Sequence, residues 1–310
     1  MVQTHSTLPF QARIRKSVFL DASFRYGCEA FSVYNRTYTA AGFSDSLTEY
    51  HDLLNGVVLW PIAGERQVEI AGPDAERFVE LLTPRDLHKQ RVGQCKYLVF
   101  THTDGGIVND PVCLRLAEDK YWLSAADSDL GLYARGVNAM AQMDVTICEP
   151  DVAVLQIQGP RSAEFMRALV GPGLADLKYY WWQHADIGGV PVIVSRTGWS
   201  TELGFEVYLA DATKGDALFD HIVAAGAAFE LKLGVVSQNR RIEGGLLSYG
   251  ADFDLGNNPY EIGLGRLVNL EKKADFIARD ALIKLAGAPP SRQITGLLIP
   301  APAVSGFIQP

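Results

Sequence analysis

The chain has 310 residues, a formal net charge of -8, and hydrophobic and charged fractions of 48% and 21%. These values are ordinary for one large or two ordinary folded domains and argue against an intrinsically disordered chain. The acidic balance, with no run of lysine and arginine, argues against a nucleic-acid partner. We find no signal-peptide core and no apolar run that could span a bilayer, so we expect a cytoplasmic protein without a membrane partner.

Cysteine and histidine spacing gives no support for a metal site. The six histidines form no H-x-x-x-H or H-E-x-x-H pattern, and the four cysteines are scattered without a C-x-x-C pair: Cys28, Cys95, Cys113 and Cys148. Such spacing fits neither a zinc clamp nor a disulfide framework. We therefore expect buried free thiols and no bound metal.

Two segments share one pattern, VEIAGPDAERFVELL at 68–82 and LQIQGPRSAEFMRALV at 155–170. Each combines a short alternating strand, a Gly-Pro pair and a helical pattern. Proline suits the first turn of a helix, so Pro73 and Pro160 are predicted to mark helix starts. The segments are either an internal repeat or two copies of a common junction, and the pattern leaves both open.

Strand-forming segments at 95–101, 106–116 and 121–126 predict a meander. The pair Asp104-Gly105 lies in its first turn and is a strong hairpin signal, because a tight primed turn needs positive φ.

The second half of the chain predicts a hairpin from 191–197 and 205–210, then helices at 212–228 and about 238–247. Strands and helices are mixed without regular alternation, which favours an α+β fold over a doubly wound sheet. The phosphate-binding patterns G-x-G-x-x-G and G-x-x-x-x-G-K-[ST] are not found where a nucleotide fold needs them.

Asp110 is the most unusual residue of the meander. In a continuous strand it shares one face with four aliphatic side chains: Val108, Val112, Leu114 and Leu116. A carboxylate there must be hydrogen-bonded, paired or carry a raised pKa. Pro111 removes a ladder donor and is typical of an edge or bulge. Asp110 is therefore either a bulge residue bonded to local amides or a carboxylate projecting into an apolar cavity.

The strand after residue 204 alternates, so that Glu206 and Tyr208 share a polar face. From spacing alone, solvent exposure explains that face well. Trp199 lies in the Gly-bracketed loop before this strand, where a large aromatic usually packs on another group.

Arg240 and Arg241 occupy the first turns of the helix predicted at 238–247, whose interior would hold Gly244-Gly245. Each glycine costs such a helix about 1 kcal/mol relative to alanine, so another group is expected to pass close by. The two arginines are either a solvated face or a grip on an acidic ligand tail.

Taken together, the motifs resemble the tetrahydrofolate-dependent aminomethyltransferase family of the glycine cleavage T-protein, and most of all its dimethylsulfoniopropionate demethylase branch. They run in family order over most of residues 25–285: ERQVEI (65–70), TPRDL (83–87), GGIVNDPV (105–112), ADSD (126–129), IQGP (157–160), RTGWS with GFEVY (196–208), RIEGGLLSYGADFD (241–254) and NPYEIGLG (258–265). The segments 36–46 and 200–203 differ from that branch, which leaves the identity of the donor open.

The resemblance implies roles for seven residues. Asp110 corresponds to the central aspartate beside the folate and the transferred carbon, and is the catalytic candidate. Glu206 corresponds to the glutamate that binds the pterin ring, and Arg241 to the arginine of the R-[LI]-E motif that helps to hold the folate. The other implied folate-binding positions are Tyr97, Val112, Trp199 and Tyr208. Tetrahydrofolate is the implied co-substrate.

The family fold is a multi-subdomain ring around a central folate cleft, with chain segments shared between the first two subdomains. The resemblance thus predicts a folate-binding region at 1–285 and, at 286–310, the start of a C-terminal barrel subdomain that is truncated or missing.

Three functions remain after these steps. The leading one is transfer of a methyl or one-carbon group from a small sulfonium or ammonium donor to tetrahydrofolate. The second is aminomethyl transfer in glycine cleavage, which needs a lipoyl carrier protein as partner; the charge of -8 makes an acidic carrier less attractive. The third is a non-catalytic folate-binding protein, disfavoured because its K-G-C-Y-x-G-Q signature is missing from the sequence.

Overall fold

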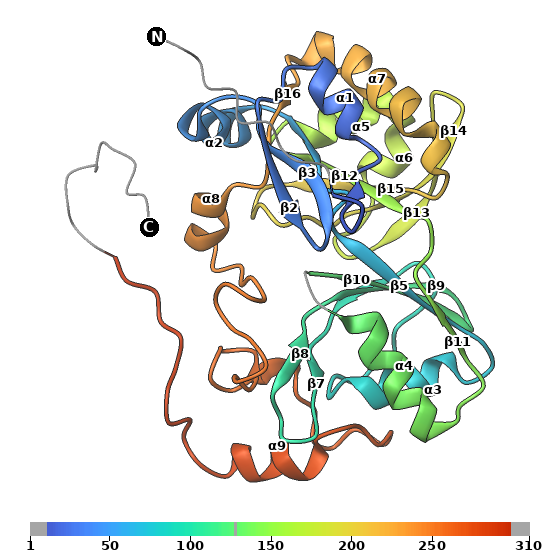
Figure 1. The fold of residues 1–310 in the computed structure, drawn as a ribbon, viewed down its shortest axis with the longest axis vertical. Helices are drawn as coiled ribbons and strands as arrows, with labels where there is room; N and C mark the ends of the chain where they lie inside the picture. Colours follow the sequence, from blue (N-terminus) through green and yellow to red (C-terminus); the bar gives the residue numbers. More distant parts are fainter. Residues whose placement is uncertain (1–10, 127–128, 299–310) are drawn as a thin grey trace.

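The computed structural model describes residues 11–126 and 129–298, which form two sheet modules, one above the other in Figure 1. Residues 1–10, 127–128 and 299–310 lie outside the described residues, so the motif at 126–129 and the segment 286–310 are seen only in part. Within the described ranges, no helix combines the length and the apolar character needed to cross a bilayer.

The upper module is built on a six-stranded sheet with the order β13-β14-β15-β12-β4-β16. Its strands are β4 (Val58–Pro61), β12 (Ala153–Gln158), β13 (Trp182–Ile187), β14 (Val190–Ser195), β15 (Gly204–Leu209) and β16 (Lys232–Leu233). Helices cover its outer face: α1 (Leu20–Arg25), α5 (Ser162–Val170), α6 (Pro172–Ala175) and α7 (Gly215–Gly226), with the short turns η1 (Ala212–Lys214) and η2 (Ala227–Phe229) on either side of α7. The core between sheet and helices includes Phe19, Phe165, Phe205 and Phe219.

The lower module is built on a five-stranded sheet with the order β11-β5-β10-β9-β6. Its strands are β5 (Arg66–Ala71), β6 (Cys95–Tyr97), β9 (Val112–Ala117), β10 (Lys120–Ala125) and β11 (Thr146–Cys148). The helices α3 (Ala75–Leu82) and α4 (Leu130–Ala141) pack on it around a core that includes Ile70, Phe78, Leu123 and Ala134.

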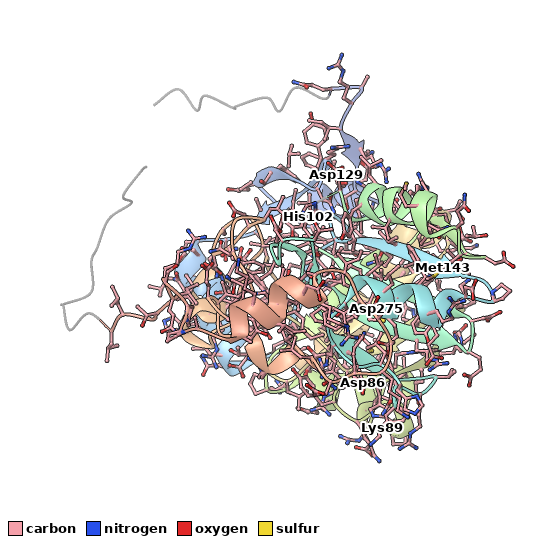
Figure 2. All side chains as sticks on the ribbon, turned by 90° about the horizontal axis from the view of Figure 1, so that it is seen from below. Asp86, Lys89, His102, Asp129, Met143 and Asp275 are labelled. Carbon is pink, nitrogen blue, oxygen red and sulfur yellow. The ribbon has the colours of Figure 1, made fainter. Side chains whose placement is uncertain are left out.

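A small hairpin of β7 (Phe100–Thr101) and β8 (Ile107–Asn109) extends from the lower module. The helix α9 (Arg279–Ala286) lies against it, with Leu282 and Leu285 close to the hairpin glycine Gly105. Figure 2 gives the view from below onto this helix.

The remaining elements lie beside the two modules. They are a three-stranded sheet of β1 (Arg15–Lys16), β2 (Ala30–Tyr34) and β3 (Thr37–Gly42), the helices α2 (Ser46–Asn55) and α8 (Gln238–Glu243), and the turn η3 (Gly265–Leu267).

The chain alternates between the modules. It enters the upper sheet with β4, forms the lower sheet over residues 66–148, and returns to the upper sheet for residues 153–233, before α9 packs on the lower module. The α+β class is confirmed, and chain segments are shared between two modules as the resemblance implies. The sheets meet through an apolar cluster that includes Leu114 and Trp122 from below and Val154, Ile193 and Tyr208 from above.

The two similar segments form the same strand, glycine and helix unit, once in each module. Gly72 and Gly159 have φ values of 139° and 114°. A Cβ on either would lie 2.5 Å or 2.4 Å from a neighbouring carbonyl oxygen, so both positions require glycine. The helices begin at Ala75 and Ser162, two residues after each proline. The Gly-Pro pairs therefore mark the helix entries as predicted, but each proline precedes the first turn and does not lie in it. The shared geometry favours a repeat.

The meander is confirmed, but each of its first two strands is interrupted. β6 pairs with β9 up to Tyr97 and Val112, while β7 and β8 pair separately from Phe100 and Asn109. Asp110 and Pro111 lie in the break. Val112, Leu114 and Leu116 pack together between the sheets, whereas Val108 packs into the lower core. The pairing register shifts between Phe100 and Thr101, opposite Val108, so the change of face lies in the β7–β8 hairpin. The expectation of one shared aliphatic face is therefore wrong for Val108 alone, and the bulge lies opposite Phe100 and Thr101 and not at Asp110 and Pro111.

The helix predicted at about 238–247 is shorter than expected. α8 ends at Glu243, and Gly245 has a φ of 70°, so the two glycines end the helix and do not lie within it. A group does pass close by, since a Cβ on Gly244 would collide with the side chain of Thr201. The predicted hairpin and the helix after it are confirmed as β14, β15 and the η1 to η2 segment.

Candidate active site

A cavity of about 910 Å³ lies between the two modules and is the main candidate site in the described part of the chain. The lower module contributes Tyr97, Asp110 and Val112, and the upper module contributes Gln156, Trp199 and Glu206. Further lining residues come from the β2–β3 hairpin and from the segments 179–181, 235–238, 245–249 and 264–267. A cavity of this size suits a ligand larger than a simple metabolite.

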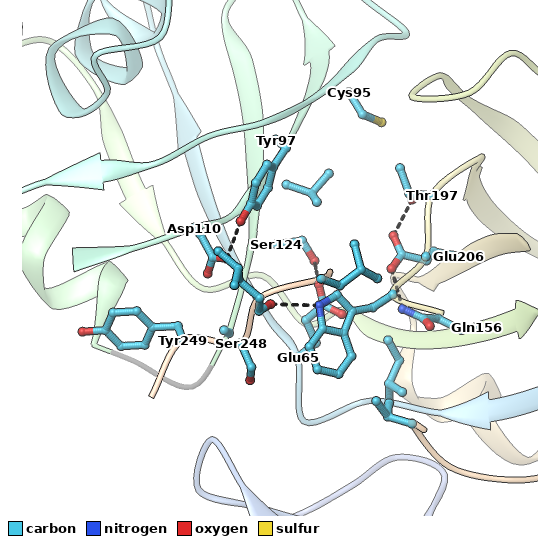
Figure 3. A pocket seen from close by; sticks show the side chains of 18 of the residues that line it. Glu65, Cys95, Tyr97, Asp110, Ser124, Gln156, Thr197, Glu206, Ser248 and Tyr249 are labelled. Atoms are coloured by element: carbon cyan, nitrogen blue, oxygen red, sulfur yellow. Dashed lines mark hydrogen bonds between the residues drawn. The ribbon is translucent and has the colours of Figure 1, made fainter. Parts of the chain in front are cut away.

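Asp110 lines the cavity and is held by one tyrosine. The hydroxyl of Tyr97 donates to Asp110 Oδ2 at 2.7 Å, as Figure 3 shows. The interruption at Pro111 makes this possible, since Asp110 leaves the ladder while Tyr97 still pairs with Val112. Burial raises the pKa of Asp110 to about 7, although the Tyr97 hydrogen bond acts in the opposite direction. Burial and the nearby Asp110 charge also raise the pKa of Tyr97.

Glu206 is surrounded by donors. It lies on the central strand β15 directly opposite Gln156 on β12 and Ser195 on β14. Oε1 accepts from Gln156 Nε2 at 2.6 Å, and Oε2 accepts from the Tyr208 hydroxyl at 2.8 Å. The Thr197 hydroxyl also donates to Oε2 (Figure 3). All six residues of β15 are buried, so the solvent-exposed alternative for the face of Glu206 and Tyr208 is wrong.

Glu65 is a third carboxyl group of the cavity, and the residue-level sequence argument missed it. It lies in the turn where the chain crosses from β4 to β5. The Ser124 hydroxyl donates to Oε1, and Ser124 in turn accepts from Gln67 Nε2 at 2.8 Å. Burial first, then the charge of Glu206, and to a smaller extent that of Asp110, raise the pKa of Glu65 to about 8.

The loop after β14 holds Trp199 at the cavity wall. Buried Gln158 packs against Gly198 and Gly204, where any Cβ would lie within 2.3 Å of its amide, and accepts from the Ser200 hydroxyl at 2.6 Å. The indole of Trp199 donates to Leu247 O at 3.1 Å. The expectation that this aromatic side chain packs on another group is confirmed.

Arg241 lies behind the wall and is not among the residues that line the cavity. Its guanidinium pairs with Asp252, donates to Leu246 O at 3.3 Å, and lies 5.4 Å from the Trp199 ring. Asp252 also accepts from Ser248 N at 2.8 Å. The structure thus places Arg241 where it holds the cavity-lining segment 245–249. Arg240 pairs with Glu202 and Glu243, so both arginines are engaged by groups of the chain.

One part of the cavity lining is basic, with Arg85, Lys96 and Arg266. Burial lowers the pKa of Arg85 and of Lys96, whose ammonium donates to Asp86 O at 2.9 Å. The cavity therefore has both anionic and cationic groups on its walls.

Of the predicted site residues, five line the cavity: Tyr97, Asp110, Val112, Trp199 and Glu206. Tyr208 and Arg241 lie behind it as partners of lining groups.

The sequence did carry a signal for some missed residues, because Gln156 and Gln158 are polar positions inside an otherwise apolar strand. Glu65 lay inside the ERQVEI motif but had no residue-level signal of its own. Among the described residues, no group of three or more His, Cys, Asp or Glu side chains could hold a metal ion.

Comparison with known proteins assigns the chain. The model of the GCVT N-terminal domain matches residues 22–272. The chain belongs to the GCVT family. Dimethylsulfoniopropionate demethylase DmdA of Ruegeria pomeroyi is 38% identical over 93% of this chain and 78% of its own length. An aminomethyltransferase of Listeria monocytogenes is 30% identical over 82% of this chain and 70% of its own length.

The GCVT fold is seen in the glycine cleavage aminomethyltransferase T of Bartonella henselae. Its crystal structure superposes with a TM-score of 0.81 at 21% identity, over 90% of this chain and 77% of the other. The T-protein type of fold, expected from the motifs, is therefore confirmed. Membership of the family also confirms tetrahydrofolate as the co-substrate expected for it.

The cavity fits a folate. A pterin ring presents an amide and an amino group, which need acceptors. Glu206 offers charged oxygens, and Gln156 Oε1 beside it is buried with no hydrogen-bond partner among the described residues. An orphaned buried acceptor at this position suits a ligand with several donors on one edge.

Proposed function

We propose that the protein transfers a methyl group from a small sulfonium or ammonium compound to tetrahydrofolate, forming 5-methyltetrahydrofolate. The observation that carries this proposal is the gathering of three buried or half-buried carboxyl groups, Glu65, Asp110 and Glu206, in one cavity. Burying a carboxylate without a charged partner costs free energy, and a bound cationic ligand lowers that cost. The similarity to a dimethylsulfoniopropionate demethylase supports the same donor class.

In this proposal Glu206 binds the donor edge of the pterin, with Gln156, Thr197 and Tyr208 holding its carboxylate in place. A carboxylate with fixed oxygens can accept two parallel hydrogen bonds. Tetrahydrofolate supplies the N5 atom that receives the methyl group.

Asp110 is proposed to face the transferred carbon. Its carboxylate favours the positive charge of the donor, and Tyr97 fixes the direction in which it points. The rings of Tyr97 and Trp199 line the same cavity and offer faces for an onium methyl group. Methyl transfer is an in-line displacement, so the walls contribute alignment and exclusion of water.

Val112 completes the proposed wall beside Tyr97, while Tyr208 and Arg241 act as positioning residues behind it. We further propose that the folate-binding region extends to residue 285. The boundary with a segment 286–310 stays a prediction, since only part of that segment is described.

Incubation with tetrahydrofolate and a donor whose methyl groups carry deuterium tests this function. Mass spectrometry should detect 5-methyltetrahydrofolate with the intact labelled methyl group, using dimethylsulfoniopropionate and its ammonium analogue trimethylglycine as donors. Formation of 5,10-methylenetetrahydrofolate that depends on an aminomethylated lipoyl carrier would instead support aminomethyl transfer. Folate binding with neither product would support the non-catalytic alternative.

A further inference from the structure

Glu65 differs from the other two carboxyl groups of the cavity in what surrounds it. Glu206 accepts from Gln156, Thr197 and Tyr208, and each of these donors stabilises the anion. Glu65 accepts from Ser124 alone, through Oε1. Its second oxygen, Oε2, has no hydrogen-bond partner within the described part of the chain and belongs to a residue that lines the cavity.

The transfer proposed above produces a proton as well as a methylated folate. The bond between the methyl carbon and the sulfonium or ammonium centre breaks, and its electron pair remains on the leaving sulfur or nitrogen. The N5 lone pair forms the new bond to carbon, and the N5–H bond then breaks with its electrons returning to nitrogen. The proton so released needs an acceptor in the cavity.

We propose that the Glu65 carboxylate accepts the proton that leaves N5 after methyl transfer, and that Ser124 fixes this carboxyl in the acceptor orientation. The inference rests on the proposed function. Glu65 suits this role better than Glu206, because both oxygens of Glu206 already accept hydrogen bonds from side chains. Asp110 has one side-chain donor, as Glu65 has, but is already assigned to the charge of the methyl donor. Saturated oxygens are poor proton acceptors.

The hydrogen bonds that link Gln67, Ser124 and Glu65 support this role of Glu65. Gln67 Nε2 donates to Ser124 Oγ, so the single Ser124 hydrogen is directed to Glu65 Oε1, and Oε2 is left without a side-chain donor within the described part of the chain. The environment also suits proton transfer near neutrality, since burial and the Glu206 charge raise the pKa of Glu65 to about 8. A bound onium donor favours the carboxylate form and lowers that pKa, which prepares the acceptor when both substrates are present.

Replacement of Glu65 by glutamine tests the inference in the full chain. We expect kcat for methyl transfer from dimethylsulfoniopropionate to fall about 100-fold, within the range of general base catalysis, while KM for tetrahydrofolate changes less than about threefold. The rise of kcat/KM with pH near 8 should disappear in this variant, and Glu65→Asp should restore part of the rate and of the pH dependence. Glu271→Gln removes an exposed carboxylate that does not line the cavity and should change neither.

A binding measurement gives a readout that does not require turnover. Calorimetric titration of dimethylsulfoniopropionate at pH 7.5, in buffers of different ionisation enthalpy, should show proton release by the wild-type protein and less release by Glu65→Gln. Equal proton release together with an unchanged kcat and pH profile would overturn the role of Glu65. If the wild-type protein forms no methylated folate from any onium donor, the proposed function fails, and the inference fails with it.

Discussion

The cavity holds two kinds of carboxyl group. The surroundings of Glu206 differ from those of Asp110 and Glu65. The structure surrounds Glu206 with amide and hydroxyl donors from β12, from β15 and from the loop after β14. It gives Asp110 and Glu65 one side-chain donor each, and burial raises the pKa of both toward neutrality. A saturated carboxylate is a fixed anchor, whereas a sparsely bonded one can respond to a charge or a proton. We infer that Glu206 binds the folate, whereas Asp110 and Glu65 take part in the chemistry.

The largest expected effect tests the chemical side of this comparison. Asp110→Asn keeps the shape but removes the charge beside the transferred carbon, so we expect turnover to fall at least about 1000-fold while the affinity for tetrahydrofolate weakens less. Product formation followed by mass spectrometry and folate titration by calorimetry measure the two quantities. Asp104→Asn, in the exposed turn of the same hairpin, is the matched control. Unchanged turnover in Asp110→Asn would leave this residue with a structural role only, at the break between β8 and β9.

Glu206→Gln tests the binding side. Loss of a charged acceptor with several donors should weaken tetrahydrofolate binding about 30- to 100-fold, while kcat at saturating folate falls much less. It should also lower the free energy of unfolding by about 1–3 kcal/mol, because buried donors lose their anion. Glu69→Gln provides the comparison, since Glu69 accepts from Trp122 at 2.8 Å but does not line the cavity. That variant should lose stability and keep its folate affinity. A Glu206 variant with normal affinity and lost turnover would reverse our assignment.

The pH dependence of stability separates the two kinds of carboxyl group in another way. The folded state raises the pKa of Glu65 from 4.5 to about 8, so folding binds a proton between these values. The protonated carboxyl group makes its full favourable contribution to the free energy of unfolding below pH 4.5. This contribution is lost as the pH rises through about 8. Glu65→Gln should therefore gain stability relative to the wild type as the pH rises, reaching on the order of 5 kcal/mol at pH 9.

Urea unfolding at a series of pH values measures this difference. Asp110→Asn should show the same trend with its midpoint nearer pH 7, because burial raises the pKa of Asp110 less far. Glu271→Gln should run parallel to the wild type at every pH, because its carboxylate is exposed. A constant difference between Glu65→Gln and the wild type from pH 5 to 9 would contradict the protonated state that we assign to Glu65.

The smallest expected effect concerns Arg241, which supports the cavity-lining segment 245–249. Arg241→Lys loses the planar fork that pairs with Asp252 and reaches Leu246 O, so the segment 245–249 should loosen. We expect KM for tetrahydrofolate to rise about five- to tenfold with little change in kcat. Arg240→Lys, which pairs with Glu202 and Glu243 away from the cavity, should change KM less than twofold. Equal effects in both variants would show that the helix, and not the cavity wall, depends on these arginines.

Much of the fold could be predicted from the sequence, because alternation and turn residues are local signals. Period-two patterns located β14 and β15, and Asp104-Gly105 located the β7–β8 hairpin. The same counting failed at Val108, where the register shift of the β7–β8 hairpin changes the face that a residue occupies. It also failed at Glu206, because whether a polar face meets solvent or another sheet depends on contacts distant in sequence.

The candidate site was predictable only in part. Single positions such as Asp110 and Trp199 were unusual in their local context, but the sequence alone could not place them in one cavity, and the ordered family motifs were needed for that. Glu65 shows the limit most clearly. Its special environment comes from Ser124 on a different strand and from two carboxyl groups elsewhere in the chain, so no local pattern marks it.

A crystal structure of the protein with 5-methyltetrahydrofolate would test most directly whether Glu206 binds the pterin while Asp110 and Glu65 face the reacting atoms. The account predicts that the donor edge of the pterin bonds to Glu206 and Gln156, and that the N5-methyl group points toward Asp110 with Glu65 within reach of N5, directly or through one water. A pterin bound instead at the basic wall of Arg85 and Arg266, with its methyl group away from Asp110, would contradict it.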